Sequence, residues 1–340
     1  MIKRILLSTL LLLVIVAAWL AWVAFGPGTA FPSSKYELYI HTGSNFDQML
    51  NTLEQDKVLT HPTMFKWLAQ KMEIPERLKA GKYEIKKGTT LMQLLRTLHN
   101  GSQTPVQMVI TKLRTREDFA RFAGKQLECD SLDILRFWND NDSLKKFGLD
   151  SNTSMTIVIP NTYTLYWNIS ASRFFRRMYS ESQKFWTSDR KQKAAQLGMS
   201  EQQVYTLASI LEEETNKYDE MPVMASVYVN RLKKGMRLSA DPTVKYALRD
   251  FAIKRINFGH ISASAESPYN TYKHEGLPPG PICIPAMKTI DATLNAASTD
   301  YIFFCAKPDF SGYHNFANNE QDHLKNARVY QRALDSLMIK

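Results

Sequence analysis

The stretch Leu207-Ala208-Ser209-Ile210-Leu211-Glu212-Glu213-Glu214-Thr215 places three carboxylates directly after an apolar run. A helix turns by about 100° per residue, so the two leucines and the alanine of this stretch gather on one side. Glu213 is then predicted to point almost opposite, into solvent, while Glu212 lies at one edge of the apolar stripe. Glu214 lies at the other edge, three residues past the second leucine and on the same side of the helix.

The position of Glu214 beside an apolar stripe has a chemical consequence. Burial disfavours the charged form of a carboxyl group, so such a carboxylate is either paired or has a raised pKa. A raised carboxyl pKa is what a general acid needs near neutral pH. The competing interpretation is a solvated helix end with three surface glutamates, and periodicity by itself favours that one.

Composition places the chain among folded globular proteins. Its 340 residues suffice for two or three domains, and 44% of them are apolar and 22% charged. The net charge of +10 suggests an anionic partner, which is a nucleic acid, an anionic membrane or a cell-wall polymer. Solvated faces rich in lysine and arginine explain the same charge without any partner.

The N-terminus predicts the compartment. Lys3 and Arg4 precede the apolar run Ile5–Phe25, and a helix of about 21 residues spans about 30 Å, enough for a bilayer core. Trp19 and Trp22 lie near its far end, where aromatic side chains favour the interface. The positive flank stays in the cytoplasm, so we expect a single-pass anchor of the inner (plasma) membrane with an extracytoplasmic body. A cleaved signal peptide is the alternative, disfavoured by the length of the run. Export argues against a nucleic-acid partner.

The fold class predicted is α+β. The segments 36–41, 83–85 and 106–110 show strand patterns. Two helical patterns lie between the first two strands, which gives a β-α-α-β order, and a third helical pattern precedes the last strand. This small domain is either a spacer or a polymer-binding module. The domain organisation predicted is a cytoplasmic tip at 1–4, a transmembrane anchor at 5–25, a linker at 26–35, a small α+β domain at 36–110, a helical connecting segment at 111–200 and a catalytic domain at 201–340.

In the connecting segment, aromatic residues from Phe174 to Trp186 follow helical spacing among many basic residues. A core stripe with a solvated back is favoured over a membrane-surface helix. Further along, Asn230 shares a helix face with Val227, so it makes either a structural hydrogen bond or a substrate contact. Asp241 precedes a proline at a helix start, and N-capping alone explains it.

The segment 257–285 is long and poor in regular pattern, and such segments inside a compact domain tend to be functional. Tyr269 and Tyr272 are suited to stacking on sugar faces, with Asn270 supplying hydrogen bonds. Packing of the two tyrosines against the core explains them equally well.

Several kinds of site are not predicted. The seven histidines show no metal-ligand spacing, and no nucleophile elbow or phosphate-binding glycine loop occurs; neither metal nor cofactor is expected. The chain has three cysteines, Cys129, Cys283 and Cys305, and this odd number implies no disulfide framework. The sequence cannot test whether the last two form a disulfide. A carboxylate on an apolar helix face, a loop rich in Tyr and Asn, and an exported chain together suit carbohydrate cleavage.

Taken together, the sequence resembles the YceG-like (MltG) family of membrane-anchored endolytic murein transglycosylases over nearly its whole length. The stretches that carry the resemblance are Leu207–Thr215, Ala225–Leu232, Gly235–Val244, Ser267–Tyr272, Gly276–Pro281 and His314–Phe316. The resemblance implies a LysM-like fold for 36–110. The chain departs from the family at Thr156–Tyr163, where an expected acid is missing and Asn161 stands for an aspartate.

The resemblance assigns roles to named residues. It implies that Glu214, directly before the threonine, is the catalytic acid, and that Glu212 belongs to the substrate-binding set as a supporting residue. Residues of the matching stretches are the expected substrate contacts: Asn230, Arg237, Asp241, Tyr269, Asn270, Thr271, Tyr272 and His314.

The resemblance also implies a reaction. A lytic transglycosylase cleaves the β-1,4 bond between MurNAc and GlcNAc and leaves a 1,6-anhydro-MurNAc end, which would limit the growth of nascent glycan strands. Peptidoglycan strands, the inner membrane and peptidoglycan synthases are the expected partners. A non-catalytic scaffold that binds glycan through 36–110 is the alternative. Strand-length preference, protein partners and oligomeric state do not follow from the sequence.

Overall fold

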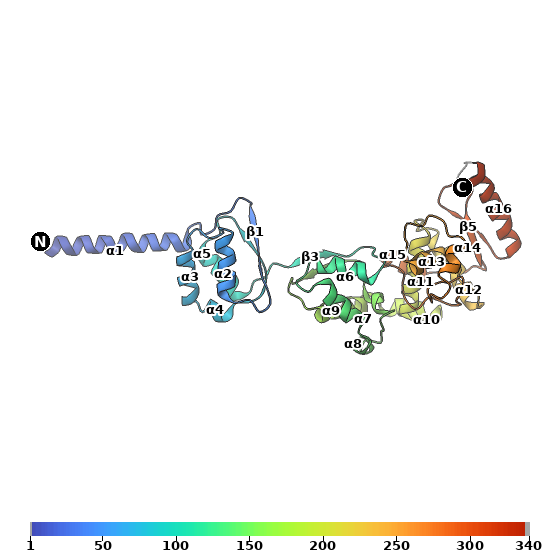
Figure 1. Ribbon diagram of the computed structural model, residues 1–340, viewed down its shortest axis with the longest axis horizontal. Helices are drawn as coiled ribbons and strands as arrows, with labels where there is room; N and C mark the ends of the chain where they lie inside the picture. Colours follow the sequence, from blue (N-terminus) through green and yellow to red (C-terminus); the bar gives the residue numbers. More distant parts are fainter. Residues whose placement is uncertain (1, 337–340) are drawn as a thin grey trace. The chain divides into compact units, whose positions relative to one another are not determined.

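The computed structural model describes residues 2–336, which form two compact units (Figure 1). Unit 1 comprises the chain up to residue 108 together with 126–129 and 163–170, and unit 2 comprises 109–125, 130–162 and the chain from 171 onward. Within the described range, helices are combined with three two-stranded sheets. The predicted α+β class is therefore confirmed.

The N-terminal helix α1 (Ile2–Phe25) is long and apolar enough to cross a membrane once. Its last turn enters unit 1, where Val23 belongs to the hydrophobic core. The segment after α1 is hydrogen-bonded to the body of the unit, because Gly28 N–H donates to the Thr89 carbonyl at 3.1 Å. A Cβ at Gly28 would lie 2.5 Å from the Leu91 backbone nitrogen, so this close approach requires glycine.

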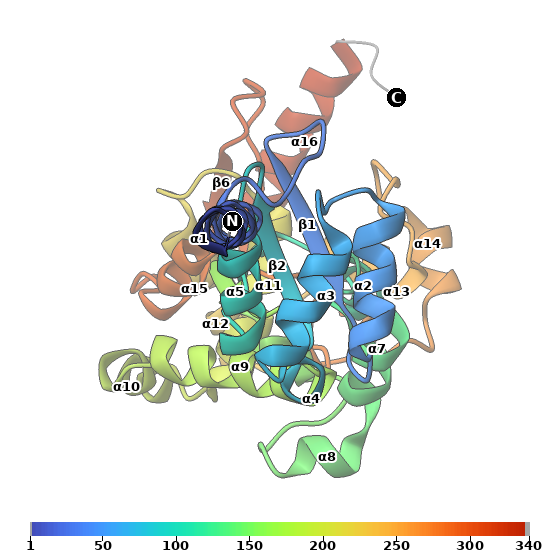
Figure 2. The same ribbon diagram turned by 90° about the vertical axis from the view of Figure 1, so that its left-hand side faces the viewer.

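Unit 1 is built on an antiparallel pair of strands, β1 (Lys35–Ile40) and β2 (Gly81–Lys86). Its helices pack on one face of this pair (Figure 2). They are α2 (Phe46–Gln55), α3 (Pro62–Lys71), α4 (Ile74–Arg77) and α5 (Leu91–Asn100). The predicted β-α-α-β order gains a third, short helix, α4, before β2, and capping boxes at Asn45 and Thr90 begin α2 and α5. The LysM-like assignment stays a prediction.

The first part of unit 2 is helical. Its elements are α6 (Arg116–Gly124), α7 (Ser131–Asn139), α8 (Asn141–Lys145), the 3-10 helix η1 (Ser154–Ile157), α9 (Ala171–Phe185) and α10 (Ser188–Gln196). Strands β3 (Val106–Val109) and β4 (Thr162–Leu165), which belong mostly to unit 1, pair with each other. Phe174 and Phe175 of α9 are fully buried against Trp138. The aromatic stripe is therefore core, as predicted.

The remainder of unit 2 surrounds one buried helix, α11 (Glu201–Glu214). It contacts α12 (Met221–Lys233), α13 (Asp241–Leu248) and α15 (Met287–Leu294). The chain also forms α14 (Phe258–Ala263), strands β5 (Phe303–Ala306) and β6 (His314–Ala317), which pair antiparallel, and α16 (Glu320–Ser336). The segment 257–285 is thus less irregular than predicted, since Asn257 starts α14 with a capping box.

Candidate active site

Glu214 is the last residue of α11, and Thr215 after it is extended. Leu207 and Leu211, seven and three residues before Glu214, are fully buried. The apolar stripe therefore faces the core, as the periodicity predicts. Glu214 itself stays partly exposed. The helix end thus presents its carboxyl at the boundary between core and solvent, where a substrate can reach it.

Within the described residues, the Glu214 carboxyl has one direct hydrogen-bond donor, the Tyr228 hydroxyl of α12, at 2.7 Å from Oε1. Burial among protein atoms raises the pKa of Glu214 to about 7, although this hydrogen bond opposes the shift. The partial negative charge at the C-terminus of α11 acts in the same direction as burial. Glu214 is therefore protonated in a large fraction of molecules near neutral pH.

A second carboxylate influences Glu214. The negative charge of Asp241, on α13, raises the pKa of Glu214, and the positive charge of Lys245 opposes that effect. Asp241 accepts a 2.6 Å hydrogen bond from the Tyr272 hydroxyl. The structure therefore brings three residues predicted from sequence, Glu214, Asp241 and Tyr272, into one neighbourhood.

The prediction that Asp241 caps α13 is wrong. Ala240 occupies the N-cap position without a side-chain cap, and Asp241 is the first helical residue. The reason is that the Asp241 carboxylate accepts the Tyr272 hydroxyl instead of a backbone N–H of its own helix.

The prediction that Glu213 points into solvent is also wrong. Its carboxylate lies 2.9 Å from Lys112 and 3.0 Å from Arg114, and its side chain is 15% exposed. Burial raises the pKa of Glu213, but the hydrogen bonds from Arg114 and Lys112 together outweigh burial and hold this pKa below its ordinary value. Both cations come from the segment before α6, about a hundred residues away in sequence, where helix periodicity carries no information.

Glu212 supports the start of α15. Its Oε2 atom accepts the backbone N–H of Ala286 at 3.2 Å and the hydroxyl of Thr289. Adjacent glutamates thus have three different environments: Glu212 fixes a neighbouring helix, Glu213 forms ion pairs and Glu214 keeps a raised pKa.

Most other predicted site residues are bonded within the protein. Asn230 donates to the carbonyls of Thr299 and Tyr301 at 2.8 and 2.9 Å. Asn270 is fully buried and donates to the Ile261 carbonyl and Ser264 hydroxyl, both at 2.9 Å. These amides shape the loops around the site, and their contact with a substrate stays a prediction.

The remaining predicted residues lie on the same loop or farther along the chain. Thr271 is buried and accepts the Ala240 N–H at 3.0 Å, which ties the loop to the start of α13. Tyr269 packs against Tyr246 with ring centroids 4.7 Å apart. Arg237 donates to the Tyr272 carbonyl at 3.5 Å.

His314 makes a separate contact. Its Nδ1 atom lies 2.8 Å from the Glu220 carboxylate, and its ring meets Phe304 edge-on. Nothing in the described structure joins His314 directly to the Glu214 carboxyl.

Among residues 2–336, no group of three or more His, Cys, Asp or Glu side chains is arranged to hold a metal ion. Cys283 and Cys305 are free thiols rather than a disulfide. Cys283 is buried, and its thiol donates to the Ser209 carbonyl of α11 at 3.3 Å.

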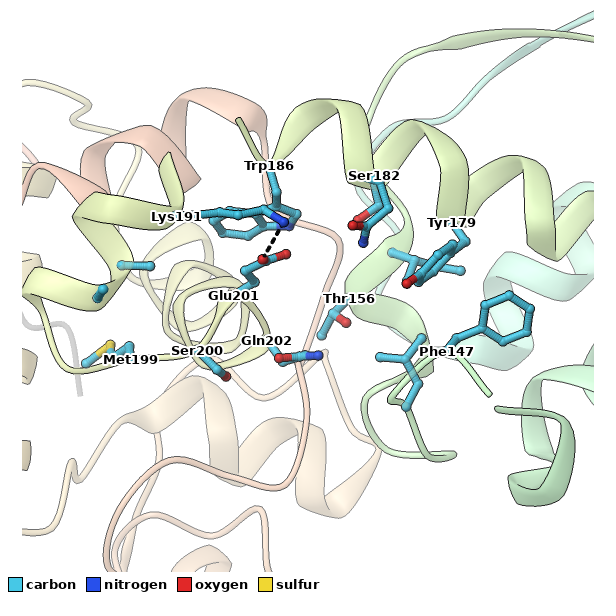
Figure 3. A pocket seen from close by; sticks show the side chains of 15 residues that line it. Phe147, Thr156, Tyr179, Ser182, Trp186, Lys191, Met199, Ser200, Glu201 and Gln202 are labelled. Atoms are coloured by element: carbon cyan, nitrogen blue, oxygen red, sulfur yellow. Dashed lines mark ion pairs between the residues drawn. The ribbon is translucent and has the colours of Figure 1, made fainter. Parts of the chain in front are cut away.

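A separate cavity of about 410 Å³ lies at the opposite end of α11 (Figure 3). Trp186 and Tyr179 line it, together with an ion pair of 3.1 Å between Lys191 and Glu201. Glu201 begins α11 and Glu214 ends it, so the two are about 20 Å apart along the helix. This cavity contains none of the predicted site residues.

Sequence reasoning missed Tyr228 and Arg231 as members of the site. Arg231 lies one turn after Tyr228 on α12. Its guanidinium donates to the carbonyls of Ile302 and Leu238 at 2.6 and 2.7 Å, and it interacts electrostatically with Glu214. Both residues stand in the stretch Ala225–Leu232 that carries the family resemblance, which was the signal that could have found them.

Comparisons with known proteins agree with the sequence. The chain is 26% identical over 307 residues to a Bacillus subtilis protein named endolytic murein transglycosylase, covering 86% of this chain and 83% of that one. A Streptococcus pneumoniae protein of the same name is 26% identical over 333 residues, and the match spans 58% of its length. These names denote the enzyme class that the sequence predicts.

The fold has a solved relative. A YceG-like protein of Listeria monocytogenes superimposes with a TM-score of 0.56 at 26% identity, covering 86% of this chain and 98% of that one. The profile of the YceG-like family matches residues 38–329. That match spans most of the chain and confirms the resemblance seen in the sequence. The protein therefore belongs to the YceG-like family.

Proposed function

We propose that this protein is an endolytic murein transglycosylase in which Glu214 alone acts as acid and then as base. The observation that carries the proposal is a partly exposed carboxyl at the end of α11 with a pKa of about 7. A group with this pKa holds a proton at the pH where it works and accepts one back with little penalty. The names of the two curated relatives support the same reaction class.

In the first step, protonated Glu214 donates its proton to the glycosidic oxygen between MurNAc and GlcNAc. The bond between that oxygen and the anomeric carbon of MurNAc breaks, the GlcNAc residue leaves with a free hydroxyl, and an oxocarbenium-like centre develops. As the proton leaves, Glu214 becomes a carboxylate, and the hydrogen bond from Tyr228 stabilises this charge.

In the second step, the Glu214 carboxylate removes the proton from the 6-hydroxyl of the same MurNAc. The 6-oxygen attacks the anomeric carbon and closes a 1,6-anhydro ring. Glu214 regains its proton and no water is consumed. A second protein carboxylate is not required as nucleophile, in contrast to most glycosidases, because the substrate supplies its own.

The side chains around Glu214 are proposed to orient the sugar. Tyr272, held by Asp241, presents its ring near the acid, and Arg237 is exposed nearby with its side chain on the Tyr272 carbonyl. The proposed substrate-binding set is completed by Tyr269, Asn270, Thr271, Asn230 and His314. The buried members of this set act by fixing the loops around the site. Glu212 acts as a supporting residue.

We further propose that α1 anchors the protein in the inner membrane with its N-terminus in the cytoplasm. Lys3 and Arg4 precede the apolar run, and cationic residues favour the cytoplasmic side. The body then meets nascent peptidoglycan strands close to the membrane, next to the synthases that make them. Cleavage there would limit strand elongation.

The test is digestion of purified peptidoglycan by the reconstituted full-length protein, with mass spectrometry of the products. We expect 1,6-anhydro-MurNAc ends, and we expect Glu214→Gln to abolish them. Glu213→Gln is the matched control, because it changes the adjacent carboxylate and should retain cleavage.

Each other outcome has a distinct meaning. Cleavage by Glu214→Gln would remove Glu214 from the mechanism. Products with ordinary reducing ends would make the protein a hydrolase. Tight glycan binding without cleavage by the wild type would indicate the scaffold instead.

A further inference from the structure

An apolar groove of about 790 Å³ lies between the C-terminal part of α1 and the helix α3. One wall is formed by α1 from Trp19 to Phe25, and the other by Met64, Trp67 and Leu68. All of these residues belong to unit 1. We call this feature the anchor groove.

The walls of the anchor groove expose large apolar side chains. Trp67 is 52% exposed, Trp19 58% and Phe25 62%. In water, a continuous apolar surface of this kind is unfavourable and marks a site that another apolar partner covers. No other part of residues 2–336 covers these side chains.

The groove is continuous with the candidate membrane helix. Val23, one turn after Trp19 on the same face of α1 and next to Trp22, is buried in the core of unit 1, so the body of the unit begins at the level of these tryptophans. In Figure 1, α3 lies at the side of unit 1 from which α1 leaves and runs across the direction of α1. If α1 is surrounded by lipid along its length, the same lipid reaches the anchor groove.

We propose that the anchor groove binds the acyl chains of phospholipids in the leaflet where α1 ends, and so seats unit 1 on the membrane. The proposal rests on the proposed membrane location of α1. Trp67 would join Trp19 and Trp22 in one aromatic belt at the bilayer interface, where amphipathic rings favour the headgroup level.

Charge at the rim fits this occupant. The Lys71 ammonium lies 5.9 Å from the centre of the Trp67 ring, and Lys66 is exposed beside it. In the proposed arrangement these cations pair with lipid phosphates, while the Trp67 ring contacts the acyl chains. His61 and Thr63 also line the groove and add polar groups to its wall.

The experiment uses the full chain in phospholipid vesicles whose acyl chains carry bromine, a contact quencher of tryptophan emission. In a Trp19→Phe/Trp22→Phe background, the remaining tryptophans besides Trp67 are Trp138, Trp167 and Trp186, which are 1%, 8% and 3% exposed. Quenching in this background therefore reports on Trp67. Bromine placed near the headgroup and bromine near the chain end serve as two depth probes.

We expect lipid brominated near the headgroup to quench this background about twofold more strongly than the same protein carrying Trp67→Phe. Bromine near the chain end should quench less. A further control adds Tyr39→Trp to the Trp67→Phe protein, because Tyr39 is exposed on β1 outside the groove; this tryptophan should not be quenched.

Equal quenching with and without Trp67 would overturn the proposal, and so would protection of Trp67 from lipid but not from a water-soluble quencher. The wild type provides the separate test of location: unquenched Trp19 and Trp22 would disprove the anchor and the groove together. Loss of peptidoglycan cleavage would affect neither result, since the vesicles contain no glycan.

Discussion

The Tyr228 hydroxyl on α12 donates a 2.7 Å hydrogen bond to Oε1 of Glu214 at the end of α11. Tyr228 is almost fully buried, and burial, followed by the charge of Glu214, raises the pKa of its hydroxyl well above the ordinary value. The hydroxyl therefore remains a proton donor throughout the working pH range. Its hydrogen bond favours the ionised form of Glu214, whereas burial disfavours that form.

Tyr228→Phe should shift the pH dependence of cleavage upward. A general acid must be protonated, so wild-type kcat/KM should fall as pH rises through about 7, the pKa of Glu214. Without the hydrogen bond this pKa rises further, and the alkaline limb should move up by about one pH unit. Pre-steady-state or steady-state pH profiles measure the shift.

The control for that change is Tyr205→Phe. Tyr205 is also buried, but its hydroxyl donates to the Val158 carbonyl at 2.6 Å, away from Glu214. This variant should lose stability without moving the alkaline limb. An unmoved limb in Tyr228→Phe would show that the hydrogen bond does not tune the acid.

Asp241→Asn should shift the same limb in the opposite direction. The negative charge of Asp241 raises the pKa of Glu214, so its removal lowers that pKa and moves the limb to lower pH. Asparagine keeps an oxygen that can accept the Tyr272 hydroxyl, which separates the effect of charge from the loss of that contact. The pH profile of kcat/KM is the readout, and an upward movement would contradict the assignment.

Glu214→Gln should stabilise the fold at pH 8 while abolishing activity. The folded pKa of about 7 exceeds the ordinary value of 4.5, so the folded state loses stability as pH rises from 4.5 to 7. Glutamine removes this penalty, which is at most about 3 kcal/mol. Denaturant unfolding should show the gain at pH 8 and none at pH 4.

Glu213→Gln should have the opposite effect on stability. The pKa of Glu213 is lowered, so its contribution is present above pH 4.5 and is lost as pH falls through the folded pKa. We expect a loss of about 1 to 3 kcal/mol at pH 8, because Lys112 and Arg114 lose their partner. An equal change of unfolding free energy at pH 8 in Glu214→Gln and Glu213→Gln would show that the two carboxyls do not have different environments.

Glu212→Ala should destabilise the start of α15. It removes the acceptor for the Ala286 N–H and the Thr289 hydroxyl, two groups at the N-terminal end of that helix. A loss of about 1 to 2 kcal/mol is expected in thermal unfolding. Glu212→Gln should recover part of it, and neither variant should move the pH profile of cleavage.

Much of the fold followed from local pattern. The helical patterns between the predicted strands correspond to helices such as α2 and α5, because periodicity and capping depend on neighbours within one or two helical turns. The same reasoning failed at Asp241, where a proline after an acid suggested a cap. The acid instead accepts a hydroxyl from Tyr272, 31 residues later.

The sequence by itself determined that Leu207, Ala208 and Leu211 would be buried and that Glu214 would lie beside them, since helical periodicity is a property of adjacent turns. The structure buries α11 on every side from Val204 to Leu211, which periodicity does not predict. Only the tertiary structure decided what each carboxylate meets. Lys112 and Arg114 approach Glu213 from about a hundred residues away, and Tyr228 and Asp241 approach Glu214 from other helices. The pKa of a carboxyl depends on burial and on nearby charges, and packing between distant segments sets both.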